Sequence, residues 1–429
     1  MIRTLFRVLN IMLILDLVFR GEKETESTWA WILLLLNFPI IGFLLFLLTG
    51  QRMPKQEWKN KEEYIGGLTE DNHVDILATG EEKFSAVFSD IMNAKKEILI
   101  QYYIFKDDFL FENLKQLLYK KVTEGVKVRV LYDRLGSRRM RKRRWRELKS
   151  KGIEVKSFKH RVKNPVVSTV FGLNYRNHRK ILVVDGYIGY IGGYNVGKEY
   201  LGMDHRFGFW RDTHFRLVGS VVDSLRNIFL EDWGECGNFV PLQGGGGGSA
   251  VQVVSSGPRT SSPHIRNVYL RCISGAKEKI WIQTPYFIPD SAVLNALKLA
   301  LLSGKEVKLM IPCKPDHMFV YSATVYYAAE LLRMGAGIYI YQKGFLHAKG
   351  IIMDEEVYCF GTANMDIRSF HLNYEVNAIV YGQEEVGKMC LLYKKDLEDC
   401  KELTWQEYAS RSLKNRVKEQ ISRLLSPLL

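Results

Sequence analysis

Two stretches, HRKILVVDGYIGYIGGYN at residues 178–195 and HAKGIIMDEEVYCFGTAN at residues 347–364, decide the fold of this 429-residue chain. In both, a lysine follows the first histidine by two positions, an aspartate by seven and an asparagine by seventeen. A Gly–Gly or Gly–Thr pair precedes the asparagine in each stretch. So many matching polar and glycine positions indicate two copies of one motif inside an internal repeat.

The likeness extends to both sides of the motif. The further matching pairs are KKEILIQYYIFKDD (95–108) with KEKIWIQTPYFIPD (277–290), GVKVRVLYD (125–133) with GKEVKLMIP (304–312), and DTHFRLVG from Asp212 with EVNAIVYG from Glu375. Near-continuous apolar runs such as ILIQYYIF predict strands buried on both faces. Helical patterns over 111–124 and 291–303 predict right-handed β-α-β crossovers between them. We therefore predict an α/β fold of two pseudo-symmetric lobes related by an approximate twofold axis.

The duplication sets the domain boundaries. We place the first lobe at residues 53–243 and the second at 250–429, joined by the stretch GGGGGS (244–249), whose composition is that of a linker, natural or engineered. Residues 405–429 alternate basic and apolar positions at helical spacing. This last stretch either caps a lobe or rests on a membrane surface, and we prefer the cap.

The amino-terminal region, residues 1–52, has the composition of a membrane anchor. Residues 29–49 carry no charge, and a helix of that length spans a hydrocarbon core of about 30 Å. Residues 5–19 contain Arg7 and Asp16, so they form either a second crossing or an amphipathic helix in the interface. We prefer a hairpin of two crossings, because the basic flanks then face the cytoplasm. A multi-pass protein of the cell membrane with a cytoplasmic catalytic body is the prediction.

The net charge and the cysteine pattern indicate which kinds of ligand the chain binds. The net charge of +14 favours partners that carry phosphate, such as nucleic acid, anionic lipid or a phosphorylated small molecule. The basic run RRMRKRRWR (138–146) is either an anionic-lipid contact or a solvated helix face, and the membrane anchor argues against nucleic acid. Six scattered cysteines form no C-x-x-C pair, and no histidine cluster has zinc spacing. We predict reduced thiols, no metal and no cofactor.

The His-x-Lys pattern carries the chemistry. Residues two apart on a strand point to the same face, so His178 projects with Lys180, and His347 with Lys349. A neighbouring cation keeps an imidazole neutral and nucleophilic, and it also attracts an anion such as phosphate. Two symmetry-related histidines would then lie on opposite sides of one phosphate. In that arrangement one ring attacks phosphorus and the other protonates the leaving oxygen.

These residues resemble the phospholipase D superfamily, whose double HKD motif the chain carries complete, and within it the bacterial cardiolipin synthases. The resemblance covers nearly the whole chain. It also rests on WRDTHFRLVG (210–219), VVSSGP (253–258), FLHAKGIIMD (345–354) and GTANMDIRSFHLNYEVNA (361–378).

The resemblance implies a role for each motif residue. His178 matches the nucleophile that forms a phosphohistidine, and His347 matches the general acid and then base. The phosphate-binding positions are Lys180, Asn195, Lys349 and Asn364, and the carboxylates expected to orient the histidines are Glu375 and Asp212. Asp185 and Asp354 complete the catalytic motifs, although we expect them to hold the motif loop together rather than to touch substrate.

The implied reaction joins two phosphatidylglycerol molecules into cardiolipin and glycerol at a membrane surface. A phospholipase D-type hydrolase or a phosphatidylserine synthase would use the same residues. A phosphodiesterase nuclease would too, but it gains nothing from a membrane hairpin. An inactive membrane scaffold is the alternative from a different class. The sequence leaves the oligomeric state open, a homodimer included.

Overall fold

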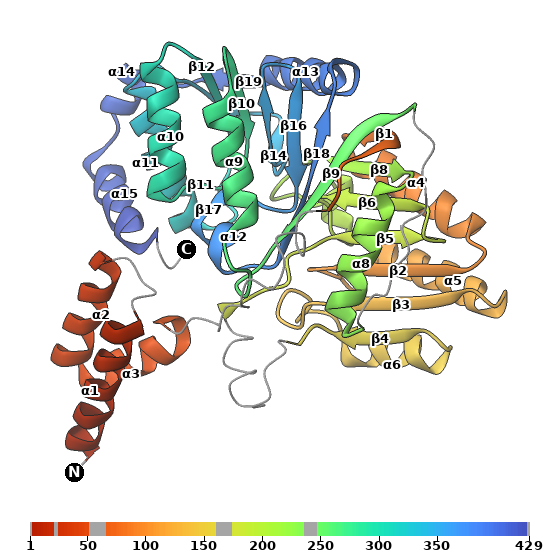
Figure 1. Cartoon of the computed structure of the whole chain (residues 1–429), viewed down its shortest axis with the longest axis horizontal. Coiled ribbons are helices and arrows are strands. Elements are labelled where there is room, and N and C mark those ends of the chain that lie inside the picture. Colours follow the sequence, from red (N-terminus) through yellow and green to blue (C-terminus); the bar gives the residue numbers. More distant parts are fainter. Residues whose placement is uncertain (1, 21–24, 51–65, 160–173, 236–246, 427–429) are drawn as a thin grey trace. The chain divides into compact units, whose positions relative to one another are not determined.

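A computed structural model describes residues 2–20, 25–50, 66–159, 174–235 and 247–426. The chain divides into two compact units (Figure 1). One comprises residues 1–55 with 159–176, and the other comprises residues 56–158 with 177–429.

The first unit is a small group of helices at the amino terminus. It contains α1 (Ile2–Arg20), α2 (Thr25–Asn37), α3 (Pro39–Leu45) and a π-helical turn over Phe46–Gly50. Leu17, Leu35 and Phe46 form its buried core. In the parts of the chain that the structure describes, no helix is both long and apolar enough to cross a membrane.

The helix predicted over 29–49 is not continuous in the structure, and Pro39 is the physical reason. Proline has no N–H to donate to the carbonyl four residues earlier, and it disfavours helical geometry at the residue before it. Phe38 accordingly leaves the helical region, with φ −125° and ψ 67°, and separates α2 from α3. The carbonyl of Leu35 instead accepts a hydrogen bond from Asn10 Nδ2 at 2.8 Å. The segment predicted over 5–19 lies within α1.

The second unit is built on one continuous sheet of fifteen strands. Its order is β19-β13-β12-β10-β15-β16-β18-β9-β1-β8-β6-β5-β2-β3-β4. The first half of the chain supplies β1 (Thr69–Leu77), β2 (Glu97–Tyr102), β3 (Lys127–Tyr132), β4 (Glu154–Ser157), β5 (Ile181–Val184), β6 (Ile188–Gly192) and β8 (His214–Val218). The second half supplies β9 (Ser249–Ser256), β10 (Lys279–Gln283), β12 (Glu306–Pro312), β13 (Gly337–Tyr341), β15 (Gly350–Met353), β16 (Val357–Gly361), β18 (Glu375–Tyr381) and β19 (Cys400–Glu402).

The strand order is the same in both halves when each is followed from the middle of the sheet outward. β1-β8-β6-β5-β2-β3-β4 corresponds to β9-β18-β16-β15-β10-β12-β13, and β19 is an addition at one edge. The two halves meet where β1 pairs antiparallel with β9, as a twofold relation requires. The predicted pseudo-symmetric α/β lobes are thus confirmed in architecture.

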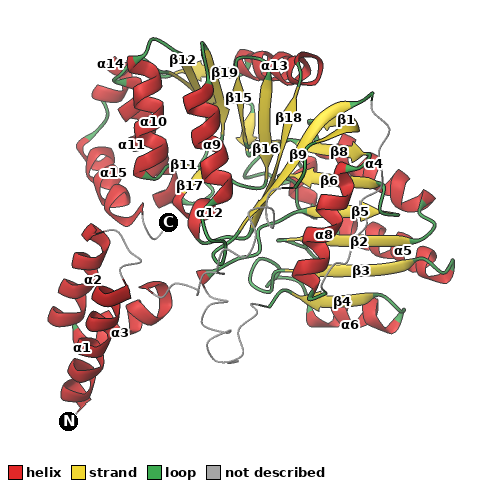
Figure 2. Cartoon of the chain, viewed as in Figure 1, coloured by secondary structure: helices red, strands yellow, loops and turns green. Residues whose placement is uncertain are grey.

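Helices cover both faces of the sheet (Figure 2). The first half contributes α4 (Gly80–Asn93), α5 (Phe109–Thr123), α6 (Lys142–Ser150) and α8 (Val221–Trp233). The second contributes α9 (His264–Gly275), α10 (Ser291–Leu302), α11 (Met318–Leu332), α12 (Ile367–His371), α13 (Gln383–Glu398), α14 (Trp405–Ala409) and α15 (Leu413–Leu425). As predicted, α5 and α10 connect parallel strand pairs, β2 with β3 and β10 with β12.

One hydrophobic core continues from the first half into the second. It includes residues of α8 in the first half and of α13 in the second. At the junction, the rings of Phe215 and Phe360 stack with centroids 3.4 Å apart. Burial of this shared core fixes the two halves relative to each other, because separating them would expose it to water.

The structure describes the basic run 138–146 and part of the glycine-rich linker 244–249. In the basic run, Trp145 is buried against Tyr132, and Arg144 bonds Asp107 at 2.8 Å, so part of the run serves packing within the first lobe. Ser249, the last residue of the glycine-rich linker, begins β9. Residues 236–246 of the predicted lobe boundary lie outside the described residues, so the division into 1–52, 53–243 and 250–429 stays a prediction.

Candidate active site

Short parallel strand pairings bring each motif histidine to a carboxylate of the other lobe. β14 (Gly344–Leu346) pairs in parallel with β7 (Phe209–Arg211), with Leu346 opposite Arg211. The next residues along these strands are His347 and Asp212, so the register sets them side by side. An isolated parallel bridge between Asn177 and Tyr374 does the same for the residues that follow, His178 and Glu375.

The resulting contacts are crosswise. His178 Nδ1 of the first lobe lies 3.0 Å from both carboxylate oxygens of Glu375 in the second. His347 Nδ1 of the second lobe lies 2.6 Å from Asp212 Oδ2 in the first. A carboxylate at Nδ1 holds the proton on that nitrogen and leaves Nε2 with its lone pair. Each ring can therefore present Nε2 to a substrate.

The two carboxylates are buried and held differently. Glu375 accepts hydrogen bonds from Thr362 Oγ1 at 2.6 Å and Asn373 Nδ2 at 3.1 Å. Asp212 accepts one from the backbone N–H of Thr213 at 2.8 Å. A Cβ on Gly193 would overlap the Asp212 carboxylate, so glycine at this turn makes room for the acid. The repeat places Thr362 at the corresponding position, where its hydroxyl supports Glu375.

Both motif lysines are buried beside the histidines. Lys180 Nζ donates to the carbonyl of His178 at 2.7 Å, and Lys349 Nζ lies 2.7 Å from His347 Nδ1. Lys349 also lies 3.8 Å from Asp212 Oδ2, whereas no carboxylate of the described residues is within ion-pair distance of Lys180. Burial lowers the pKa of Lys180 to about 7 and that of Lys349 to about 8. A buried ammonium without a counter-ion favours the arrival of an anion.

The same environment keeps both imidazoles neutral. Burial, followed by the charge of Lys349, lowers the pKa of His347 to about 4, and Asp212 only partly opposes this. Burial also lowers the pKa of His178, assisted by Lys180 and opposed by Glu375. Near neutral pH both Nε2 atoms are therefore available as nucleophiles or proton acceptors.

The two motif asparagines are buried, and each already makes hydrogen bonds within its own lobe. Asn195 Oδ1 accepts from the backbone N–H of Ile104 at 3.1 Å, and its Nδ2 donates to Tyr200 Oη at 3.0 Å. Asn364 Nδ2 donates to Asp366 at 3.2 Å, and its buried Oδ1 has no partner among the described residues. Each Nδ2 has a second hydrogen. That hydrogen is what either amide can offer to a phosphate.

The motif aspartates lie at the other end of the motif strands. Asp185 follows β5, roughly 16 Å along an extended chain from Lys180. Its carboxylate accepts from the backbone N–H groups of Lys95, Lys96 and Glu97 at 2.8, 2.7 and 3.0 Å. Asp354 repeats these three contacts before β10. The structure therefore does not bring Asp185 or Asp354 to the histidines, and both hold the start of a neighbouring strand.

Two buried polar clusters next to motif residues were not predicted from the sequence. The first joins Asp232 of α8 to Gln101 and Arg179, and the second joins Asp396 of α13 to Gln283 and Arg211. Arg179 and Arg211 directly adjoin His178 and Asp212 in the chain, so these clusters anchor both sides of the site. The identical glutamine in ILIQ (98–101) and IWIQ (280–283) was the available signal, because a buried strand seldom repeats a polar residue without a partner.

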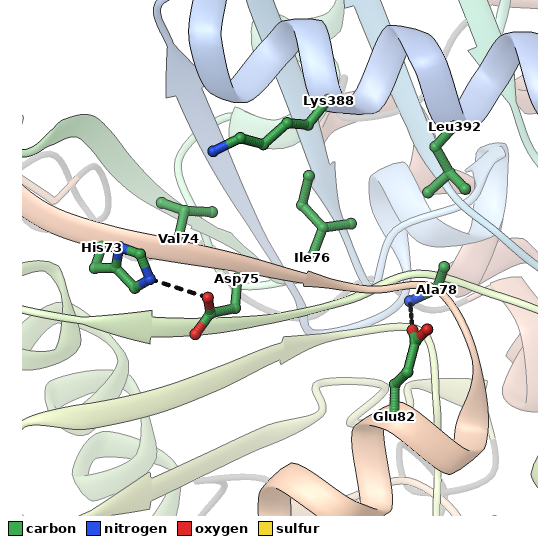
Figure 3. Close-up of a pocket in the computed structure, with 8 residues that line it drawn as sticks. All are labelled: His73, Val74, Asp75, Ile76, Ala78, Glu82, Lys388 and Leu392. Carbon is green, nitrogen blue, oxygen red and sulfur yellow. Dashed lines mark hydrogen bonds and ion pairs between the residues drawn. The ribbon is translucent and has the colours of Figure 1, made fainter.

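A separate groove of about 370 Å³ lies where β1 passes α13. Val74 and Ile76 point from β1 toward Lys388 and Leu392 of the helix, while His73 bonds Asp75 (Figure 3). None of the motif residues lines it, so we do not assign it to catalysis. Within the described ranges, no group of three or more His, Cys, Asp and Glu side chains is placed to hold a metal ion.

Comparison with known proteins identifies the family. Residues 87–233 and 269–397 match the family described as "Cardiolipin synthase, PLD-like domain". The chain belongs to this family. Residues 8–51 also match the family described as "Phospholipase_D-nuclease N-terminal".

Full-length relatives agree with this assignment, and a solved structure shares the fold. The chain is 42% identical to the major cardiolipin synthase of Bacillus subtilis strain 168, over 99% of this chain and 98% of that protein. It is also 42% identical to the cardiolipin synthase of Oceanobacillus iheyensis, over 98% of each. The crystal structure of phosphatidylserine synthase from Haemophilus influenzae Rd KW20 superimposes with a TM-score of 0.63 at 15% identity, covering 83% of this chain and 95% of that one. At that identity the last likeness concerns the fold alone.

Proposed function

We propose that this phospholipase D-like enzyme is a cardiolipin synthase that uses His178 as nucleophile and His347 as general acid and base. Its full-length relatives are named cardiolipin synthases, which are phosphatidyltransferases. The observation that carries the mechanism is the crosswise pairing of each histidine with a carboxylate of the opposite lobe, beside two buried lysines. This pairing suits a site with one ring on each side of a shared phosphate.

The first step is displacement at the phosphorus of phosphatidylglycerol. His178 Nε2 forms a bond to phosphorus while the bond from phosphorus to the glycerol head group breaks. A proton from His347 goes to the departing glycerol oxygen. Lys180 and Lys349 balance the charge of the phosphate oxygens, and the arriving anion raises the pKa of both lysines and of His347. With its pKa raised, His347 takes up from solvent the proton that it then gives to the leaving oxygen.

The second step reverses the roles. His347 accepts the proton of a hydroxyl on the head group of a second phosphatidylglycerol, and that oxygen attacks phosphorus. The bond from phosphorus to His178 breaks, and cardiolipin is released. One phosphodiester replaces another, so no nucleotide is consumed. If water takes the place of the second lipid, the same site acts as a hydrolase.

Product analysis distinguishes these outcomes. The purified full chain is incubated with phosphatidylglycerol, and lipids and glycerol are followed over time. We expect cardiolipin and glycerol in equal amounts. Phosphatidic acid as the main product would instead identify a hydrolase, and phosphatidylserine formed on addition of serine would identify a serine-using transferase. A wild type no more active than His178→Ala would indicate a scaffold.

Labelling tests the assignment of the two histidines. With phosphatidylglycerol that carries radioactive phosphorus, His347→Ala should slowly accumulate labelled protein, because its nucleophile is intact and its base is missing. His178→Ala should accumulate none. Label on His178→Ala instead of His347→Ala would reverse the roles of nucleophile and acid.

We also propose that residues 1–52 hold the enzyme on the membrane, with the catalytic body on the cytoplasmic side. Large apolar side chains of this region are more than half exposed, among them Leu5, Met12, Phe19, Trp29 and Ile41. Such a surface favours lipid over water. Retention of the full chain in the membrane pellet after alkaline extraction, and protection from protease added outside intact cells, are the expected results.

A further inference from the structure

The carboxy-terminal helix α15 presents its apolar side to solvent. Leu413, Val417, Ile421 and Leu424 are 75%, 50%, 47% and 70% exposed. A surface helix ordinarily turns such a stripe toward the protein core. Here the predicted cap packs against α11, but it does so with its other side.

Polar contacts fix this orientation. The buried side of α15 carries Glu419, Ser422 and Ser426. Glu419 accepts from Tyr408 Oη and from Arg411 Nε, each at 2.9 Å, and Ser426 lies 3.0 Å from Tyr327 Oη of α11. Rotation of the helix to bury its leucines would break these hydrogen bonds. It would also separate the Glu419 carboxylate from its partners, which is costly for a buried charge.

Basic residues border the exposed stripe on both sides. At about 100° per residue, the four apolar side chains fall within an arc of about 80°. Lys414 and Lys418 follow on one side of that arc, and Arg416 and Arg423 on the other. Glu419 is the sole acidic residue of the helix and is buried with Arg411, so the exposed charges of α15 are positive. An apolar stripe between two basic rows has the pattern of a helix that lies in a membrane interface.

We propose that α15 docks the second lobe on an anionic lipid bilayer, with Leu413, Val417, Ile421 and Leu424 inserted between the head groups. Lys414, Lys418, Arg416 and Arg423 then contact lipid phosphates. The charge of this surface selects an anionic bilayer as the occupant rather than an uncharged partner. This docking adds a lipid contact to the proposed function, and it rests on that function because the anionic lipid is taken to be the substrate phosphatidylglycerol.

The helix against which α15 packs, α11, begins beside a carboxylate that acts on the site. At that start Met318 and Phe319 are 61% and 49% exposed, next to Asp316, which accepts a hydrogen bond from Tyr286. Asp316 is one of the carboxylates whose charge acts on Lys349. The exposed Met318 and Phe319 therefore offer a second apolar contact for lipid, next to a carboxylate whose charge acts on the motif lysine.

Photocrosslinking in the full chain tests the occupant. Benzoylphenylalanine replaces Ile421 in one sample and Asn415, exposed on the opposite side of the helix, in a matched control. Both proteins are reconstituted with phosphatidylglycerol and phosphatidylcholine and irradiated. We expect several-fold more lipid adduct from position 421. Adducts to the amino-terminal helices or to a second copy, or lipid adduct no greater than at 415, would overturn the proposal.

Kinetics give an independent readout. Lys414→Ala should raise the apparent KM for phosphatidylglycerol in vesicles about fivefold, which corresponds to about 1 kcal/mol per basic residue at an anionic surface. Ile421→Ser should raise it as well, while turnover of detergent-dispersed short-chain substrate stays unchanged. Equal losses on both substrates would contradict docking. A wild type that makes cardiolipin but gives no lipid adduct refutes α15 docking alone, whereas a wild type without cardiolipin refutes the proposed function.

Discussion

Glu375 and Asp212 occupy matching places in the repeat, yet their side chains differ by one methylene group and by their surroundings. Glu375 meets His178 with both oxygens and is held by two side-chain donors, whereas Asp212 meets His347 with one oxygen and borders Lys349. Burial would raise the pKa of both acids, but their histidine and lysine neighbours lower it on balance. Both are therefore ionised near neutral pH and can fix the tautomer of the opposing ring.

Neutralising each carboxylate should damage a different step. We expect Glu375→Gln and Asp212→Asn each to lower kcat by roughly 10⁴-fold, because an amide no longer fixes the productive tautomer. Labelled enzyme should be scarce in Glu375→Gln, whose nucleophile is impaired, and should persist in Asp212→Asn, whose base is impaired. Quantified phosphoprotein after rapid quenching gives the answer. Identical labelling in the two variants would show that the carboxylates do not serve separate histidines.

The buried lysines predict a narrow pH optimum for the free enzyme. Below pH 6.5 activity should fall as His178 becomes protonated, and its lowered pKa places that limb on the acid side of the ordinary value. Above about pH 7 to 8, Lys180 and then Lys349 lose their protons, so phosphate binding and kcat/KM should decline. In the complex the phosphate raises both lysine pKa values, which moves the alkaline limb of kcat to higher pH.

Steady-state rates measured from pH 5 to 10 test the predicted pH optimum, and Lys180→Arg is the control. Arginine stays protonated throughout that range, so the part of the alkaline limb that Lys180 causes should vanish even if kcat is reduced. A wild-type kcat/KM that stays flat from pH 7 to 9 would contradict the assignment.

At the scale of elements, Asp185 and Asp354 join the end of each motif strand to the start of its neighbour. Both adopt positive φ angles, 54° and 52°, which asparagine tolerates. Asp185→Asn should therefore keep the turn but weaken three charge-assisted hydrogen bonds, at a cost of about 2 kcal/mol. We expect a lower midpoint of denaturant unfolding and near-normal kcat for the folded fraction. Asp354→Asn is the matched variant, and a kcat loss like that of His178→Ala in either would assign the aspartate to catalysis.

Local patterns were enough to predict most elements of the catalytic body. Apolar runs around the motifs predicted β2, β5, β10 and β15, and the two-residue spacing placed each histidine and lysine on one face. Pairing across long separations was harder to foresee. Arg211 and Asp396 are 185 positions apart, and neither periodicity nor composition indicates that they meet. The break at Pro39 was not predicted, because a membrane helix can contain proline when neighbouring groups satisfy the carbonyl that it leaves free.

At the scale of the whole molecule, the crosswise carboxylates make the two lobes one functional unit. Neither lobe alone contains a histidine together with its own orienting acid, and the shared core around Phe215 and Phe360 holds the register that aligns them. In the proposed mechanism the two histidines of this symmetric scaffold take different roles. The cluster at Asp396 reinforces this, since Arg211 reaches from the first lobe to an acid of the second.

The proposed site takes both histidines from one chain, so inactive variants should not rescue each other. Full-length His178→Ala and His347→Ala are purified, mixed and reconstituted together with phosphatidylglycerol, and cardiolipin formation is compared with each variant alone. We expect no more than the sum of the separate rates, whether or not the chains associate into dimers. Covalently joined wild-type and double-variant chains provide the positive control. Restored activity in the mixture would mean that lobes exchange between chains, so that β1 of one chain pairs with β9 of another.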